Sequence, residues 1–478
     1  MKHKIYAFSI LLAGLMFTSC EEDYLNPSPT AAVSASDYYS TEAQLEAGII
    51  SMYDGLQGVN ILADTDVNKN HSVQFEFYLT EMRSDNTKTK SSEGEAAQFE
   101  DFTIQATNGI VVDYYRSCYD IIFRANTVLE NLGVASAENA LKFEGEAKFV
   151  RAYAYFNLVR LFGDVPLVDR VIAPLETDIQ FTRVGTSTIY DLIVSDLDAA
   201  VKSLDDTYQN RASRSAAEAL LAKVHLTLGN YSEAKALCES VMGAGFSLEP
   251  EFKDVFYSEG NNEVIFAIGY VSDNSNDSQN FSTEWLNAVG RTAGVNYVTD
   301  EAKAILDEKG GNRTQYSYRQ DLLQSQFYQV IKYLPDGDAA LGIDPVSSDP
   351  TLAGNDWIVL RYADVLLMHV EAIIGAGNGT STTDPAALAS FQEVRNRAGL
   401  TDAVTSITKE ELLDERRVEL AFENQRFFDL VRFGVATEVL SEFAANNGFT
   451  FSTTDLLLPI PQREIGLSNG QLTQNPGY

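Results

Sequence analysis

Side chains that could carry chemistry are few and scattered along the chain. The sequence has four histidines, of which His225 and His369 fall inside apolar helical patterns, where packing is the usual role. No spacing of His, Cys and carboxylates typical of a zinc site occurs. The segment 466–470 resembles a nucleophile-elbow string, but no histidine follows it. Among 68 acidic residues some pair always falls at a glycosidase separation, so carboxylate pairing carries no information about catalysis, and a secreted glycosidase stays one of the alternatives.

Two polar segments match parts of a calcium-binding loop. Asp273, Asp277 and Glu284 occupy positions 1, 5 and 12 of an EF-hand-like loop, but Ser278 stands where the tight turn requires glycine. The second segment lacks both the glycine and the glutamate, and its candidate ligands are Asp64, Asp66, Asn68 and Asn70. A solvated polar loop is the favoured interpretation of both segments, with Ca²⁺ as the alternative and no other cofactor predicted.

Recognition of a sugar calls for a flat aromatic ring against its C–H face and for polar groups at its hydroxyls. Trp285 lies in an Asn- and Ser-rich stretch, where its ring either faces solvent or anchors the loop. Trp357 is expected to open an apolar helix, so core packing is the predicted role. Further aromatic candidates on the irregular part of the chain that holds Trp285 are Tyr297, Tyr316 and Tyr318.

The segment 81–86 supplies the polar candidates for sugar binding. Arg83, Asp85 and Asn86 could hold pairs of sugar hydroxyls through bidentate and amide hydrogen bonds. The alternative is that Asp85 and Asn86 only cap a turn, because both residue types bond readily to nearby backbone. The sequence alone favours neither interpretation.

The charge of the chain excludes two classes of partner. The chain has 478 residues with 35 basic and 68 acidic side chains, and its net charge is −33. Nucleic acid and anionic membrane surfaces would be repelled, so neither is an expected partner. A hydrophobic content of 45% predicts a folded chain with a sizeable core.

The N-terminus has the pattern of an export signal. Lys2 and Lys4 precede an apolar run over residues 5–17, which is too short to span a bilayer, and Cys20 follows. The pattern resembles a bacterial lipoprotein signal, which implies removal of residues 1–19, acylation of Cys20 and a lipidated tether over 20–36. An ordinary signal cleaved elsewhere is the alternative. The acidic residues 21–23 resemble the surface-export tag of Bacteroidetes lipoproteins. We therefore expect a lipid-anchored, surface-exposed outer-membrane protein that contacts the membrane only through its anchor.

Hydrophobic spacing predicts mainly helices after the tether. Apolar residues recur at helical intervals around 41–56, 112–129, 143–161 and 189–200, with a capping pair at Thr41 and Gln44. Cys118 and Cys238 fall inside such patterns, where a buried thiol is the common outcome. Residues 60–108 and 246–350 show no sustained period, apart from short β-like runs such as 264–270.

Residues 215–242 form the clearest repeat unit. Ser215 and Glu218 make a capping pair, and small residues at Ala222, Gly229 and Ala234 match the spacing of a tetratricopeptide helix pair. A second pair is predicted from residues 360–374 and 387–394. We expect a mostly α-helical single unit over 37–478, with scaffold helices around 110–245 and 356–445, long irregular insertions around 60–108 and 246–350, and a few short strands.

Five blocks of the sequence resemble the SusD/RagB family of Bacteroidetes outer-membrane nutrient-binding lipoproteins. Three are EGEAKFVRAYAYFNLVRLFGDVPLV at 144–168, SRSAAEALLAKVHLTLGNYSEAKALCESVM at 213–242 and DWIVLRYADVLLMHVEA at 356–372. The others are EELLDERRVELAFENQRFFDLVRFG at 410–434 and LLPIPQREIGLSNGQLTQNPGY at 457–478. They follow the family's order over essentially the whole mature chain.

The resemblance implies a SusD-like fold with tetratricopeptide-type helices on one side and ligand-side loops around 60–108 and 246–350. It further implies a binding protein rather than an enzyme, which captures an oligosaccharide or polysaccharide and delivers it to a SusC-like TonB-dependent transporter. Capture of peptides, as in the RagB branch, and a scaffold role without a small ligand are the alternatives.

Charged residues within the 410–434 block have a simpler explanation than ligand binding. Buried guanidinium groups need paired carboxylates, so a structural ion-pair network is predicted there. Its expected members are Arg416, Arg417, Glu419, Arg426 and Arg432.

Overall fold

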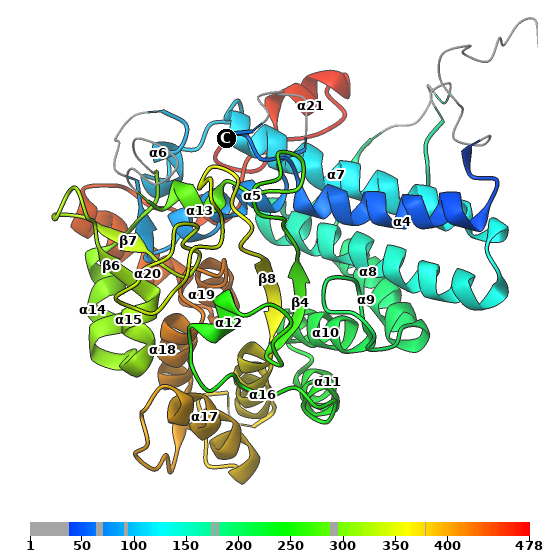
Figure 1. The fold of residues 1–478 in the computed structure, drawn as a ribbon. Coiled ribbons are helices and arrows are strands. Elements are labelled where there is room, and N and C mark those ends of the chain that lie inside the picture. Colours follow the sequence, from blue (N-terminus) through cyan, green and yellow to red (C-terminus); the bar gives the residue numbers. More distant parts are fainter. Residues whose placement is uncertain are drawn as a thin grey trace, which may run out of the picture.

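The computed structural model describes residues 38–63, 70–89, 94–173, 176, 181–286, 295–377 and 379–478. In these residues, eight long helices form an array in which each helix packs against the next one (Figure 1). In packing order they are α4 (Glu42–Gln57), α7 (Gly109–Glu130), α8 (Ala137–Phe162), α9 (Thr186–Ser203), α10 (Arg214–Leu228), α11 (Tyr231–Met242), α16 (Tyr362–Ala376) and α17 (Pro385–Arg397). The mostly helical fold predicted from the sequence is confirmed.

Local sequence signals explain where these helices begin and end. The Thr41 side chain accepts from the backbone N–H of Gln44 and caps α4, as predicted. Gly163 ends α8 with a positive φ of 71°, a conformation that glycine adopts without strain. The cap of α10 is Ser213 and not Ser215, because the backbone is extended at Ser213 and its hydroxyl accepts from Ala216 N at 3.1 Å.

Two tetratricopeptide-type pairs, α10–α11 and α16–α17, lie at the predicted positions and stack through α11 and α16. Gly375 permits this close approach, since a Cβ on it would lie 2.4 Å from the Tyr231 ring. The residues between the pairs therefore loop out while the helices on either side remain in contact.

Trp357 opens a strand, which corrects the prediction of a helix at this point. Strand β8 (Trp357–Arg361) pairs antiparallel with β4 (Val264–Ile268), the run that the sequence predicted as β-like. Ile358 and Val359 are β-branched and favour the extended form. Helix α16 begins only at Tyr362, directly after the strand.

Short elements fill the two insertions and the C-terminal region. The other helices are α5 (Val73–Leu79), α6 (Ala97–Glu100), α12 (Asp254–Tyr257), α13 (Phe281–Glu284), α14 (Asp300–Lys309), α15 (Thr314–Ser317), α18 (Lys409–Glu419), α19 (Arg426–Phe433), α20 (Ala436–Asn447) and α21 (Gln462–Leu467). Short 3₁₀ turns are η2 (Glu81–Arg83), η3 (Leu132–Val134), η4 (Gly311–Arg313) and η5 (Thr453–Leu456). The remaining strands form two-stranded antiparallel pairs: β1 (Thr87–Lys88) with β5 (Tyr297–Val298), β2 (Val165–Pro166) with β3 (Arg183–Val184), β6 (Tyr318–Gln320) with β7 (Tyr328–Val330), and β9 (Ser381–Thr382) with β10 (Ile407–Thr408).

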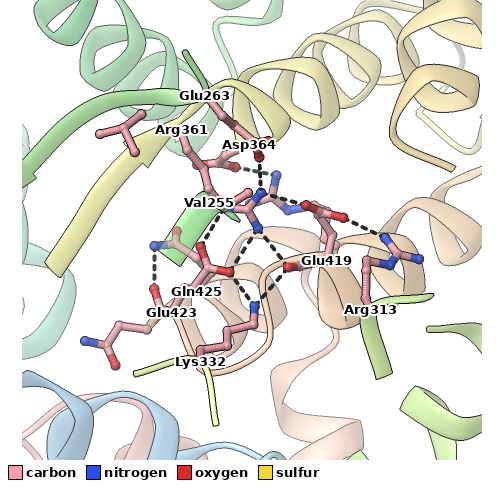
Figure 2. Close-up of polar contacts among 12 residues, drawn as sticks. Val255, Glu263, Arg313, Lys332, Arg361, Asp364, Glu419, Glu423 and Gln425 are labelled. Carbon is pink, nitrogen blue, oxygen red and sulfur yellow. Dashed lines mark hydrogen bonds and ion pairs between the residues drawn. The ribbon is translucent and has the colours of Figure 1, made fainter. Parts of the chain in front are cut away.

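A buried ion-pair network joins β8 to α18 and to the second insertion (Figure 2). The Arg361 guanidinium pairs with Glu263 at 2.7 Å, with Glu419 at 2.6 Å and with Glu423 at 2.7 Å. Lys332 pairs with the same Glu423 at 2.6 Å. Burial disfavours the charge of Glu419, but the guanidinium groups of Arg361 and two further arginines hold its pKa well below the ordinary value.

The predicted ion-pair network of the 410–434 block is confirmed. Arg416 pairs with Asp364 at 2.8 Å and with Asp429 at 2.8 Å, and Arg432 pairs with Glu371 at 2.6 Å. These side chains lie almost entirely out of solvent. Their carboxylate partners come from α16 and α19, so the network fastens the second helix pair to the C-terminal helices.

Replacing Arg361 with alanine should destabilise the fold strongly. The change removes a counter-charge that three buried glutamates share, and breaking a buried pair in this way costs about 3–5 kcal/mol. We expect the free energy of unfolding, measured by urea denaturation, to fall by about that amount. The control is Lys235→Ala, which breaks an exposed pair with Glu239 on α11 and should cost less than about 1 kcal/mol. Equal losses in the two variants would contradict the structural importance of the network.

Candidate functional site

Arg83, a predicted ligand residue, is completely buried beneath the C-terminal region. Its guanidinium donates to the carbonyls of Leu79 at 3.2 Å and Asp455 at 2.7 Å, and it lies 4.2 Å from the centre of the Phe427 ring. The side chain holds the chain together at this point. Arg83 is therefore not presented at the described surface, and its ligand-binding role stays a prediction.

The side chains of Asp85 and Asn86 also form ion pairs and hydrogen bonds within the protein. Asp85 pairs with Arg417 at 3.0 Å and Arg426 at 2.8 Å, while Asn86 accepts from Arg417 Nε at 2.9 Å and donates to Glu81 at 3.3 Å. Burial opposes ionisation of Asp85, but the two guanidinium groups hold its pKa well below the usual range. Both side chains are almost fully buried, so neither is presented to a ligand.

Trp285 belongs to an internal aromatic cluster and is only 1% exposed. Its ring lies 5.2 Å from Tyr333, 5.8 Å from Phe77 and 6.3 Å from Phe281, measured between ring centres. The loop-anchoring interpretation matches this geometry, and the solvent-facing interpretation is wrong. Trp357 lies 5.3 Å from Phe281 in the same cluster, as its predicted core role requires.

The tyrosine candidates differ in their exposure. Tyr297 is completely buried, with its ring centre 5.0 Å from that of Phe327, so its ring is not presented at the described surface and its ligand role stays a prediction. Tyr316 and Tyr318 are half-buried, and the Tyr318 hydroxyl donates to Asp307. A ligand-binding role for Tyr316 stays a prediction.

The weak calcium pattern is not assembled in the structure. The described residues hold no group of three or more His, Cys, Asp or Glu side chains placed to bind a metal ion. Asp273 accepts from two backbone N–H groups at 2.8 and 3.1 Å, Asp277 accepts from Asn274, and Glu284 is completely buried. The described geometry does not bring these three side chains together, and Ca²⁺ binding by this segment stays the alternative to a solvated loop. In the second segment, Asp64, Asp66 and Asn68 lie outside the described residues.

Open space on the described surface includes three adjoining hollows, which we call the groove, and a further hollow of about 400 Å³ that shares Tyr208 with one of them. The inner hollow, of about 580 Å³, is lined by residues 206–210, 255–261 and 354–356. The middle hollow, of about 450 Å³, lies between α4 and β4 and shares Asn210, Glu259 and Asp356 with the inner one. The outer hollow, of about 510 Å³, lies between the end of α4 and α7 and shares Asp54 with the middle one.

Two amide side chains build the wall of the inner hollow. Gln209 Nε2 donates to the carbonyls of Asn261 and Val264 at 2.9 Å, which ties the α9–α10 loop to the start of β4. Asn261 donates to the Ser258 carbonyl at 2.8 Å and accepts from Glu263 N at 3.0 Å, which closes the turn before β4. The wall is therefore set by hydrogen bonds within the chain rather than by a ligand.

Tyr208 is the exposed aromatic ring of the inner hollow. It lies in the α9–α10 loop and is 42% exposed, enough to present a ring face to a sugar. Lys142 and Arg211 lie 5.2 and 5.3 Å from the ring centre. Arg211 is paired with Glu146 at 2.7 Å, and Lys142 lies 3.6 Å from Asp205.

Asn355 and Asp356 form the floor beside β8. Asn355 is 3% exposed, and neither its Oδ1 nor its Nδ2 has a hydrogen-bond partner among the described residues. Asp356 Oδ1 accepts from Tyr270 N at 2.8 Å. Burial raises the pKa of Asp356 to about 6; the hydrogen bond from Tyr270 opposes this rise, and the nearby charge of Glu259 adds to it.

The outer hollow contains both signs of charge. Arg124 pairs with Asp54 at 2.6 Å and with Asp120 at 2.8 Å, so its charge is compensated. Arg116 lines the same hollow. Neither histidine nor cysteine is among the described lining residues of the three hollows, and the amide, hydroxyl and carboxylate groups present can form hydrogen bonds with a polar ligand.

Comparison with known protein families finds matches to two long parts of this chain. A SusD family model matches residues 342–478, and a SusD-like model described as starch-binding associating with outer membrane matches residues 23–226. The C-terminal match covers the second helix pair and the C-terminal block, and the N-terminal match covers α4 to α9 and most of α10, ending before α11.

The chain belongs to the SusD/RagB family.

Three similar proteins illustrate how far this membership extends. SusD-like protein P2 of Formosa agariphila is 26% identical over 99% of this chain and 100% of its own length. Starch-binding protein SusD of Bacteroides thetaiotaomicron is 25% identical over 76% of this chain and 78% of its own. A solved laminarin-binding SusD-like protein is 26% identical, with a TM-score of 0.75 over 92% of this chain and 100% of that one.

Tyr208, Asn355 and Asp356 of this SusD-family chain were not predicted from the sequence. Tyr208 stands alone among polar residues in the loop between two predicted helices, and the criterion that selected Trp285 would also have selected it. Asn355 and Asp356 directly precede the apolar run of β8, where the sequence resembles an ordinary strand or helix boundary. Only the fold brings these three residues to one hollow.

Removing the charge of Glu259 should lower the pKa of Asp356. Glu259 is exposed and its negative charge favours the protonated form of Asp356, so Glu259→Gln removes one of the causes that raise this pKa. The measurement is an NMR titration of the Asp356 carboxyl carbon in the folded protein. A pKa that stays unchanged in the variant would show that the two carboxylates do not interact.

Proposed function

We propose that the mature protein is a surface-anchored, glycan-binding lipoprotein that captures an oligosaccharide or polysaccharide and delivers it to a SusC-like TonB-dependent transporter. The observation that carries this proposal is the groove, with its exposed Tyr208 ring beside amide and carboxylate groups. Such groups recognise hydroxyls and C–H faces without chemical turnover. Support also comes from the likeness to the laminarin-binding protein and to the starch-binding SusD.

The proposed attachment to the outer membrane depends on Cys20, which lies outside the described residues. In the described part of the chain, no helix is long and apolar enough to cross a bilayer. A lipid anchor supplies membrane affinity through buried methylene groups, at about 0.8 kcal/mol each, and more than one acyl chain is needed for stable anchoring. Residues 1–19 as signal and 20–36 as tether complete the proposed arrangement.

Glycan binding is tested by affinity electrophoresis of residues 21–478 in gels that contain laminarin, starch or other neutral polysaccharides. We expect retardation by at least one glycan, and Tyr208→Ala should weaken it about 3- to 10-fold through loss of ring contact. The matched control is Tyr328→Ala, a half-buried tyrosine of β7 that lines none of the three hollows. Retardation that survives Tyr208→Ala would keep the function and reject the groove. A folded chain that binds peptides but no glycan would favour the RagB-like alternative.

Acylation is tested by growing cells that express the full chain with labelled palmitate. We expect label on the protein and its recovery in the outer-membrane fraction, both abolished by Cys20→Ser. Cys118→Ser is the matched control, because that thiol is buried within α7 and should not be acylated. Label that persists in Cys20→Ser would contradict the anchor.

A further inference from the structure

The inner hollow contains a buried amide that the protein itself leaves unsatisfied. Asn355 lines the hollow at 3% exposure, and its side-chain atoms Oδ1 and Nδ2 lack hydrogen-bond partners among the described residues. Buried side-chain amides in folded proteins are nearly always hydrogen-bonded, so an exception needs an explanation. A hydroxyl group is both donor and acceptor, and two neighbouring sugar hydroxyls would satisfy both ends of the amide.

The backbone around Asn355 is held from both sides, so the amide occupies a fixed position. Gln279 donates through its backbone N–H to the backbone carbonyl of Ala353 at 2.9 Å and through Nε2 to the backbone carbonyl of Asn355 at 3.4 Å. A Cβ on Gly354 would lie 2.2 Å from Ser272 Oγ, so only glycine allows the segment to approach this closely. A polar group fixed in this way pays little ordering entropy when it binds.

The charge of the hollows selects against anions. The described lining residues of the inner and middle hollows include no lysine or arginine. Their carboxylates are Asp54, Asp206, Glu259, Asp277 and Asp356. The nearest cations beside Tyr208 lie close to carboxylates of their own, as Lys142 does to Asp205 and Arg211 to Glu146. A uronate or sulfate group on the side of Asp206, Glu259 and Asp356 would meet like charges, and the cations nearest to it, Lys142 and Arg211, lie on the other side of Tyr208 in the hollow of about 400 Å³ that shares this ring.

From these contacts, and resting on the proposed function, we propose that the inner hollow is a subsite for one neutral pyranose unit. The Asn355 amide binds a pair of its hydroxyls, the Tyr208 ring covers its C–H face, and the surrounding carboxylates exclude acidic sugars. A volume of about 580 Å³ lies within the range of small-molecule sites.

The charge preference is tested with pairs of oligosaccharides that differ only at C6. The probes are β-glucan, mannan and galactan hexasaccharides, each compared with its C6-oxidised uronate form by calorimetry at pH 7.5 on residues 21–478. We expect at least 10-fold weaker binding of the oxidised member of any pair that binds. Glu259→Gln should reduce that ratio several-fold, because it removes one repelling charge, whereas Lys235→Ala on the exposed face of α11 should leave the ratio unchanged.

The hydroxyl contact is tested with Asn355→Leu, which replaces an unsatisfied amide by an apolar group of similar size. Such a change should leave the melting temperature equal or higher, because no internal hydrogen bond is lost. Binding of the neutral hexasaccharide should nevertheless fall at least 10-fold. Weaker binding together with a lower melting temperature would mean that Asn355 is a structural residue and would overturn the hydroxyl contact.

The outcomes separate this inference from the function on which it rests. Equal affinity for neutral and oxidised forms, or full affinity in Asn355→Leu, would overturn the neutral subsite while glycan binding stands. No binding to any polysaccharide by the folded chain would instead reject the proposed function. If Asn355→Leu fails to fold, the amide is structural and that contact is overturned, while the Glu259→Gln ratio still decides the charge preference.

Discussion

The Arg361 guanidinium, held by three buried glutamates, is the interaction on which the rest of this structure depends. Its partners come from the residue before β4, from the end of α18 and from the turn that follows α18. One planar cation thus joins the second insertion, the second helix pair and the C-terminal region. Buried charges of this kind rarely add much net stability over an apolar core, but removing one partner is costly. Removal of any one of these charged side chains is therefore expected to be costly. The β4–β8 pairing, with its antiparallel register, lies directly beside this junction.

That fixed pairing in turn positions the groove. Asn355 and Asp356 immediately precede β8, and residues 255–261 end two residues before β4, so the antiparallel pairing of β4 with β8 brings both walls of the inner hollow together. The α9–α10 loop is then tied to the same strand by Gln209. Tyr208 reaches the hollow because the helix array places α10, which follows its loop, beside β4. The binding surface is thus assembled from three separate parts of the chain, none of which would form it alone.

Much of the scaffold was predictable because it rests on local signals. Helical spacing, the Thr41 cap and the two helix pairs follow from residues close in sequence, and the paired role of Arg416 follows from the cost of burying a guanidinium. The β8 strand was missed because its extended form depends on pairing with β4, about ninety residues away in the chain. The Ser213 cap was missed because Ser215 offers the same side chain two residues later.

The candidate site was less predictable, for a physical reason that Arg83, Asp85 and Trp285 share. A sequence shows that a side chain can bind a hydroxyl or cover a sugar face, but the same polarity and size suit an internal network. Asp85 forms ion pairs with Arg417 and Arg426, and Trp285 packs in a cluster of aromatic rings. In each case the partners come from distant parts of the chain. Asn355 is the reverse case. In the sequence it looks like an ordinary residue at the start of a strand, but in the fold its side-chain amide has no hydrogen-bond partner among the described residues. What separates a binding group from a structural one is whether the fold has already satisfied it.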